Sequence, residues 1–466
     1  MIQNIGINTY NPNIGVNTRK IKATNKHSFK GALSLGTPLS NPVYNKNSIN
    51  TKLSQEESKK YTYLVDFLKK VPVSPNAEKL TCAKQLDLLL KNGKLLSRSS
   101  NDRSTTLDNL YDIATTPRAD GLDAKKVLSN TLDLLVNPRY VTQTFGDIPA
   151  QKVANILSKQ KPDSEVLKDT SKMNVQASGT CAAASNEVNL ANKYPAEFAR
   201  WVSALSSSQK ALYLDVRLDS ISKNKLDALT ILNLLQANIV NFGFESSKIK
   251  ITPDENAYLR AQIQAEHWDK GERNIADVLV QSAIMQLGSQ NTYDALTDTR
   301  GGNFNSNPQG LIEIEKTFVE SIAKNHEVTS LVYQKIDDNQ NLLGYNCSFE
   351  TMQKHIMDTI DLGDNVIIGY VLTNETAGRT TNPSYNAAVD GAPNKVINGH
   401  EITIVDYIKD DKGNVSFICI DTDDDSPDYV KYSADWLLPK LHHAGYPAHV
   451  VAQDEEAITK EANSIA

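Results

Sequence analysis

A cysteine with the surroundings of a nucleophile stands in the stretch VQASGTCAAASNEVNLANKYP, residues 175–195. Cys181 follows a Ser-Gly-Thr turn and opens an alanine-rich run, which places it in the first turn of a predicted helix. A thiol attacks as its thiolate, and both the positive end of a helix and a neighbouring imidazole favour ionisation. The backbone N–H of Cys181 and the side-chain amide of Gln176 could donate to the oxyanion that forms. The alternatives are a small buried residue at a helix start for Cys181 and an ordinary loop residue for Gln176.

Of the eight histidines, His400 has the position that best suits a general base. It follows Asn-Gly at the start of the predicted strand HEITIVDY, where a sheet would hold the ring rigidly. The turn at 410–413, Asp-Asp-Lys-Gly, predicts a hairpin to the strand NVSFICID. Because antiparallel pairing brings the end of the second strand beside the start of the first, we expect Asp421, or failing that Asp423, next to His400. Such a carboxylate accepts from the far ring nitrogen and fixes the tautomer. Alternation along the strand aims Glu401 at the opposite face.

Two further groups of residues suggest metal ligands, but each has a simpler explanation. The run Asp421-Thr422-Asp423-Asp424-Asp425 lacks the glycine and glutamate spacing of an EF-hand, so we expect a solvated acidic loop. The adjacent His442 and His443 would not share a face of a helix, so zinc is not expected there. The predicted chemistry requires no cofactor.

Four parts of the chain differ in composition. Residues 1–52 are rich in Asn, Thr, Ser and Gly without a sustained period, which predicts a disordered leader. Successive amphipathic runs predict a helical module over 53–160. The composition changes again at about residue 161, which predicts a separate domain over 161–450. Residues 451–466 form a tail.

The predicted domain over 161–450 changes from helices to strands along the chain. Helical patterns lie around 181–193, 196–206, 225–236, 254–265, 274–290 and 310–324. The β-branched, partly alternating segments EVTSLVYQK, NVIIGYVLTN, HEITIVDYIK and NVSFICIDTD then predict strands. Helices followed by an antiparallel sheet indicate an α+β fold.

Composition excludes several classes of protein. The 466 residues have a net charge of -6 with scattered Lys and Arg, so no basic stripe is available for nucleic acid. No apolar run approaches the roughly 20 residues that span a bilayer, and the first residues lack a Sec-type signal. The four cysteines have no CxxC spacing, which favours free thiols in a reducing compartment. We therefore expect a cytoplasmic protein, or one exported without a Sec-type signal peptide.

Taken together, these segments resemble the papain-like cysteine peptidases. The matching pieces are Gln176-x4-Cys181 at a helix start, His400 after Asn-Gly on a strand, and Asp421 after the next strand. Their order is similar to the branch of that superfamily that processes bacteriocin leaders, and VLVQSAIMQLGSQNTYDALTDTRGG is similar to a calpain segment. The resemblance touches roughly residues 170–440. It implies a papain-like domain with Cys181 as nucleophile, Gln176 as oxyanion donor, His400 as general base and acid, and Asp421 as orienting residue.

The resemblance also implies an activity. We expect a thiol hydrolase that cleaves peptide or isopeptide bonds of a polypeptide substrate through a thioester. Transglutaminases and glutamine deamidases use the same triad on a side-chain amide and are one alternative. An inactive papain-like scaffold that binds a protein partner through the leader or the helical module is the other. Ala182 departs from the family pattern, which usually has an aromatic residue or glycine after the cysteine, and Gln176 is one residue closer to the cysteine than in papain.

Overall fold

The structure is a computed structural model that describes residues 50–69, 71, 80–145, 148–170, 178–266, 271–303, 310–373, 388–389, 392–393, 396–423 and 429–452. Gln176, nearly all of the predicted leader and most of the predicted tail lie outside these residues. The described chain has an α+β fold with antiparallel sheets, as the order of helical and strand patterns predicts. None of the described helices has the length and hydropathy that a bilayer crossing needs.

The described residues form two compact units. A helical unit comprises the described residues up to 325 together with Thr422 and Asp423, and a sheet unit comprises those of 326–421 and 429–452. The chain therefore leaves the sheet unit directly after Asp421 and joins the helical unit for a short segment.

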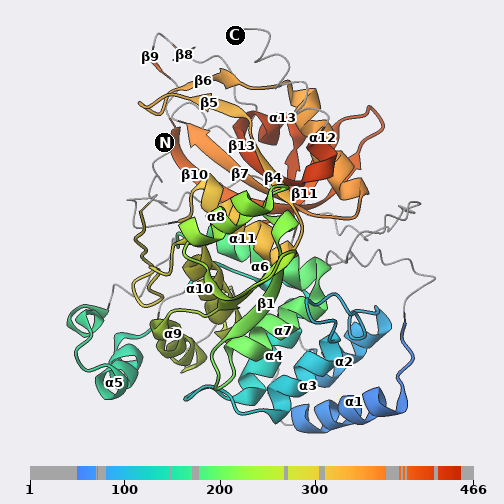
Figure 1. The fold of residues 1–466 in the computed structure, drawn as a ribbon, viewed down its shortest axis with the longest axis vertical. Helices are drawn as coiled ribbons and strands as arrows, with labels where there is room; N and C mark the ends of the chain where they lie inside the picture. Colours follow the sequence, from blue (N-terminus) through green and yellow to red (C-terminus); the bar gives the residue numbers. More distant parts are fainter. Residues whose placement is uncertain are drawn as a thin grey trace. The chain divides into compact units, whose positions relative to one another are not determined.

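The helical unit contains the following helices in its described part: α1 (Gln55–Leu68), α2 (Cys82–Lys91), α3 (Thr106–Thr115), α4 (Ala124–Val136), α5 (Ala150–Gln160), α6 (Cys181–Lys193), α7 (Pro195–Leu205), α8 (Lys225–Leu234), α9 (Glu255–Glu266), α10 (Ile275–Gly288) and α11 (Glu313–Lys324) (Figure 1). It also contains a three-stranded antiparallel sheet in the order β1-β3-β2, built from β1 (Leu212–Arg217), β2 (Asn238–Phe242) and β3 (Ser246–Ile251). The helical patterns predicted these helices, whereas the sheet was not predicted. Its strands are only five or six residues long, so each carries little periodic signal.

Helices from the predicted module at 53–160 pack directly on helices that follow it in the chain. Contacts join α3 to α7 and α4 to α10. The compact units divide at residue 325, and not at the composition shift near 161. That shift marks a polar connection between α5 and α6 inside the helical unit.

The core of the helical unit is built around α6 and α10, which contact each other. Every residue of α10 is buried, and so are the residues of α6 from Ala182 to Ala191. A helix that is buried on all sides belongs to the centre of a large core. The small side chains of Ala182, Ala183 and Ala184 permit this close packing at the start of α6. Cys181, the first residue of α6, is partly exposed.

The sheet unit contains β4 (Val328–Val332), β5 (Gln334–Ile336), β6 (Leu342–Tyr345), α12 (Phe349–Asp361), β7 (Val366–Thr373), β8 (Ala388–Val389), β9 (Ala392–Pro393), β10 (Val396–Lys409), β11 (Val415–Ile420), β12 (Val430–Ser433), α13 (Ala434–Leu437) and β13 (Leu441–Pro447) (Figure 1). Its main sheet has six strands in the order β12-β11-β10-β7-β13-β4, and each pair of adjacent strands is antiparallel. The strands β4, β7, β10 and β11 are those that the sequence predicted. Side chains of β7, β10 and β11 share one apolar core with α12, including Ile368, Ile402, Phe417 and Ile356.

The hairpin between β10 and β11 has the predicted turn. Gly413 adopts φ 85°, a conformation that favours glycine, and its N–H donates to the carbonyl oxygen of Asp410 at 3.0 Å. The register pairs Thr403 with Ile420, so the residue after β11 returns toward the start of the paired part of β10. The hairpin thus sets the position of Asp421 along the sheet.

Candidate functional site

His400 and Asp421 form a hydrogen-bonded pair in the sheet unit. The Nε2 atom of His400 lies 2.7 Å from Oδ1 of Asp421. Both side chains are largely buried, with 9% and 10% of their surfaces exposed. A hydrogen bond that involves a carboxylate is stronger in such surroundings than in water. The structure therefore brings together the predicted base and the predicted acid, and it selects Asp421 over Asp423.

Aromatic side chains surround this pair. The ring of Tyr370, the partner of His400 on β7, approaches the imidazole edge-on with 5.8 Å between centroids. The hydroxyl of Tyr432 donates to Oδ2 of Asp421 at 3.4 Å, and the Tyr432 ring stacks on Trp436 at 4.6 Å. Both oxygens of Asp421 thus have hydrogen-bond partners, which limits rotation of the carboxylate. Tyr432 was not identified from the sequence, because its contact with Asp421 depends on the pairing of β11 with β12.

Glu401 lies on the other face of β10, as strand alternation predicts. Its Oε1 atom is 3.0 Å from Nε2 of His443 on β13, and both side chains are buried. Gly369 of β7 pairs with both residues and provides the space for them, because a Cβ atom on Gly369 would lie 2.1 Å from Cε1 of His443. Glu401 is therefore engaged away from the His400–Asp421 pair.

His442 and His443 belong to the strand β13, and the helix assumed in the sequence analysis is wrong for them. Their ring planes are nearly perpendicular, at 89°, with 5.5 Å between centroids. Adjacent residues on a regular strand point to opposite faces. The register of β13 against β7 shifts between Leu441 and His443, however, and a nitrogen of the His442 ring lies within 4.8 Å of one of the His443 ring.

Cys181 is the first residue of α6 in the helical unit. The residue before it, Thr180, gives the helix no side-chain cap, so the first N–H groups of α6 are available to other acceptors. The N-terminal end of a helix also favours negative charge. Both features suit a thiolate and an oxyanion at this position.

The turn that leads into α6 is held by buried polar side chains. The guanidinium of Arg273 donates to the hydroxyls of Ser178, at 2.8 Å, and Thr180. Asp298 accepts from the backbone N–H of Gly179 at 3.1 Å and from the hydroxyl of Tyr293 at 2.7 Å. This network fixes the backbone immediately before Cys181.

A second layer of the network lies between α6 and α10. Gln281 accepts from the Thr180 hydroxyl at 3.2 Å and donates to Oε2 of Glu187 at 2.9 Å. Burial raises the pKa of Glu187 from 4.5 to about 8. Burial, with the nearby Glu187, also raises the pKa of Asp277 well above its usual value. The interior beneath Cys181 therefore contains carboxyl groups that favour their protonated form.

The remaining cysteines differ from Cys181. Burial raises the pKa of the Cys82 thiol, and it raises that of Cys419 still further. Cys347 is partly exposed, and all four thiols are free of disulfides. Cys181 alone of the four combines partial exposure with a helix N-terminus.

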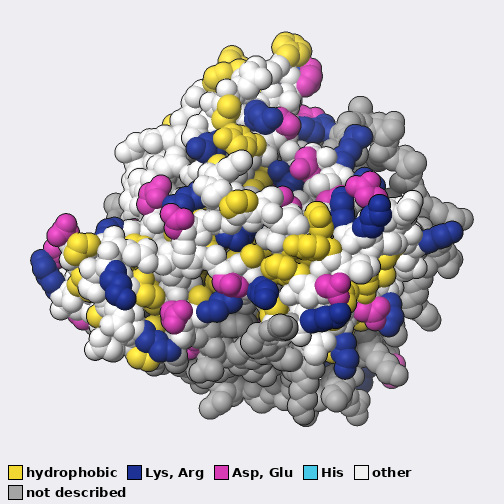
Figure 2. All heavy atoms as spheres, turned by 90° about the horizontal axis from the view of Figure 1, so that it is seen from below, with side chains coloured by type: hydrophobic (Ala, Val, Ile, Leu, Met, Phe, Trp, Pro, Cys, Tyr) yellow, Lys and Arg dark blue, Asp and Glu magenta, His cyan; other side chains and the backbone are white. Residues whose placement is uncertain are grey.

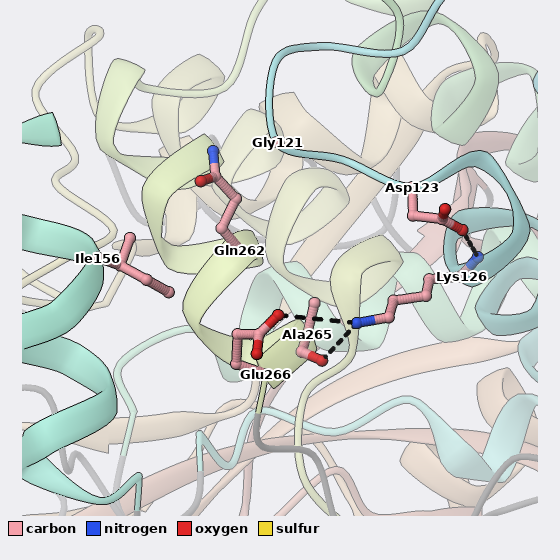
Figure 3. Close-up of a pocket in the computed structure, with 7 residues that line it drawn as sticks. All are labelled: Gly121, Asp123, Lys126, Ile156, Gln262, Ala265 and Glu266. Atoms are coloured by element: carbon pink, nitrogen blue, oxygen red, sulfur yellow. Dashed lines mark hydrogen bonds and ion pairs between the residues drawn. The ribbon is translucent and has the colours of Figure 1, made fainter. Parts of the chain in front are cut away.

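A hollow of about 360 Å³ lies elsewhere in the helical unit, between α4, α5 and α9 (Figure 3). Its lining includes Lys126, which donates to the carbonyl oxygen of Ala265 at 3.0 Å and lies 3.9 Å from a carboxylate oxygen of Glu266. The Lys126 cation is thus already engaged. The lining contains none of the predicted catalytic residues.

Surface charge follows the scattered pattern seen in the sequence. On the face drawn in Figure 2, Lys and Arg side chains alternate with Asp and Glu, and its described residues form no continuous basic stripe.

Comparisons of the chain with protein-family models, curated proteins and solved structures find no match.

Proposed function

We propose that this protein is a papain-like thiol hydrolase that cleaves peptide or isopeptide bonds, with Cys181 as nucleophile, His400 as general base and acid, and Asp421 as the orienting acid. The observation that carries the proposal is the short hydrogen bond between His400 Nε2 and Asp421 Oδ1. It is the contact that a base needs in order to hold one tautomer. A partly exposed thiol at a helix start supplies the matching nucleophile.

The proposed reaction assigns the two ring nitrogens of His400 different tasks. With Nε2 bonded to Asp421, Nδ1 takes the proton of the Cys181 thiol. The sulfur attacks the carbonyl carbon, a C–S bond forms, and the oxyanion accepts from the backbone N–H of Cys181. As the C–N bond breaks, Nδ1–H protonates the leaving amine, which leaves a thioester. Water activated by the same imidazole then cleaves the C–S bond, which releases the acid and restores the thiol.

The path of the chain supports this assignment. Asp421 is followed by Thr422, whose carbonyl oxygen accepts from the backbone N–H of Gln143 at 3.0 Å within the helical unit. The side-chain amide of Gln143 also donates to the carbonyl oxygen of Ser178 at 3.4 Å, three residues before Cys181. The acid is thus joined by one peptide bond to the network that holds the turn before the proposed nucleophile.

Thiol mapping tests the proposal. The full chain is treated with iodoacetamide near neutral pH, and the modified cysteine is identified by peptide mass spectrometry. We expect Cys181 to react first, and we expect the rate to fall in His400→Ala without loss of folding. Reaction at Cys347 alone, or a rate indifferent to His400, would rule out the proposed pair.

The product distinguishes hydrolysis of the main chain from the related reactions. New amino termini in a mixture of denatured proteins, lost in Cys181→Ala, support a peptidase. Release of ammonia from a glutamine-bearing protein without chain cleavage would assign a deamidase to the same residues. If neither new amino termini nor ammonia appears, and Cys181 does not react with iodoacetamide, the protein is an inactive scaffold.

A further inference from the structure

Gln143 lies at the junction of two segments that the proposed mechanism needs. Its side chain is fully buried, and it lies in the segment that follows α4. Its backbone N–H donates to Thr422 O at 3.0 Å, and its Oε1 accepts from the Thr422 hydroxyl at 3.2 Å. Its Nε2 donates to Asp423 Oδ1 at 3.2 Å and to Ser178 O at 3.4 Å. One side chain therefore binds the segment after Asp421 and the turn before Cys181.

Neighbouring contacts reinforce this junction. The hydroxyl of Thr142 donates to Thr422 O at 3.1 Å, and Thr142 O accepts from Gln281 Nε2 at 2.9 Å. Gln281 also accepts from the hydroxyl of Thr180, the residue before Cys181. Thr142, Thr180, Gln281 and Thr422 are all buried. Buried amides and hydroxyls in a connected network keep one geometry, because breaking any bond leaves a polar group without water.

We propose that Gln143 is a positioning residue that fixes the acid of the triad relative to the turn that carries the nucleophile. The proposal rests on the proposed function of Cys181, His400 and Asp421. The action of Gln143 on the acid is indirect. It holds Thr422 by two hydrogen bonds, and Thr422 is linked by a peptide bond to Asp421.

A purely structural role predicts a different result from a positioning role. Loss of a buried amide from any core lowers stability, but it leaves the chemistry of the remaining folded molecules unchanged. Loss of a positioning residue changes how well Asp421 stabilises the imidazolium of a thiolate–imidazolium pair. The pH range over which that pair exists then becomes narrower, because the pair forms at higher pH and loses its imidazolium proton at lower pH.

The test measures the rate of Cys181 alkylation by iodoacetate against pH in the full chain. Iodoacetate is an anion, so its reaction with the thiolate is fastest while the imidazolium is present. We expect Gln143→Ala to narrow this pH range from both sides and to lower the maximal rate about tenfold, less than the roughly hundredfold effect of a 1 Å misplacement. Asp421→Asn should act in the same direction, and the double variant should show little additional narrowing, because both changes affect one interaction.

Gln85→Ala is the matched control. Gln85 is also buried in the helical unit, and its Nε2 donates to Asp133, away from the network described above. We expect this variant to lose stability and to keep the pH range of the unmodified protein. If Gln143→Ala folds poorly, Thr422→Val removes the hydroxyl bond to Gln143 with a side chain of similar shape and should narrow the range in the same direction.

Two negative results have different meanings. A pH range that depends on His400 but is the same in Gln143→Ala, Thr422→Val and Gln85→Ala would overturn the positioning role and leave the proposed function intact. A wild-type profile that does not depend on His400 would overturn the proposed function, and the positioning role with it.

Discussion

His400 and Asp421 lie 2.7 Å apart, although 20 residues and a hairpin turn separate them in the chain. The pairing of β10 with β11 produces this contact, and Tyr432 contacts the second oxygen of the same carboxylate. Both side chains are largely buried. In the proposed reaction the other ring nitrogen of His400 transfers the proton.

Replacing Asp421 by Asn tests the orienting role. A hydrogen bond to a charged group contributes about 1.5–3 kcal/mol, so we expect kcat/KM to fall by about 10- to 100-fold. The amide cannot stabilise an imidazolium as a carboxylate does. Kinetics on a peptide substrate measure the effect, and Asp410→Asn in the exposed turn of the same hairpin is the control. Equal activities of the Asp421→Asn variant and the unmodified protein would remove Asp421 from the mechanism.

Replacing Cys181 by Ala should abolish both activity and thiol labelling, with stability within about 1 kcal/mol of the unmodified protein. Cys181 is partly exposed at a helix end, so little packing is lost. Cys419→Ala is the contrast, since Cys419 is fully buried in the core of the sheet unit. That variant should lose about 1–3 kcal/mol and keep its activity once folded. Urea unfolding measures the stability of the two variants. A Cys181→Ala variant that unfolds instead would indicate a structural cysteine.

The local parts of this arrangement could be predicted from the sequence, but the long-range parts could not. The alternation of apolar and polar residues and the turn at 410–413 predict β10, β11 and the position of Asp421. Each of these depends on residues that are close together in the chain. The turn before Cys181 depends on Arg273, Gln281 and Gln143, whose types and spacing carry no periodic signal. Only the packing of α6 against α10, and the return of the chain at Thr422, bring them together.

Glu187 should make stability depend on pH. Its pKa is raised from 4.5 to about 8, so between these values the folded protein keeps a proton that the unfolded chain releases. The free energy of unfolding must therefore fall as pH rises through this range, by at most about 1.4 kcal/mol per pH unit for one group. Glu187→Gln should flatten the dependence and be relatively more stable at pH 8. Urea unfolding at several pH values measures it, with exposed Glu56→Gln as a control that keeps the original slope.

Gly369 is required by the packing of the sheet unit. A methyl group there would lie 2.1 Å from Cε1 of His443, whose ring is bonded to Glu401. We expect Gly369→Ala to destabilise the protein by about 1–3 kcal/mol, the usual effect of overpacking. Gly399→Ala is the comparison, since the nearest atom to its added Cβ is at 3.7 Å. If both variants melt at the temperature of the unmodified protein, the close approach at Gly369 is not a constraint.

If the thiol of Cys181 and the imidazole of His400 act on one substrate, a short reagent with two alkylating carbons can join them. The protein is treated with 1,3-dibromoacetone, and the products are identified by peptide mapping. We expect a bridge between Cys181 and His400 that disappears when either residue is replaced by Ala. Cys181 modified without a bridge, or bridged to a different histidine, would contradict it.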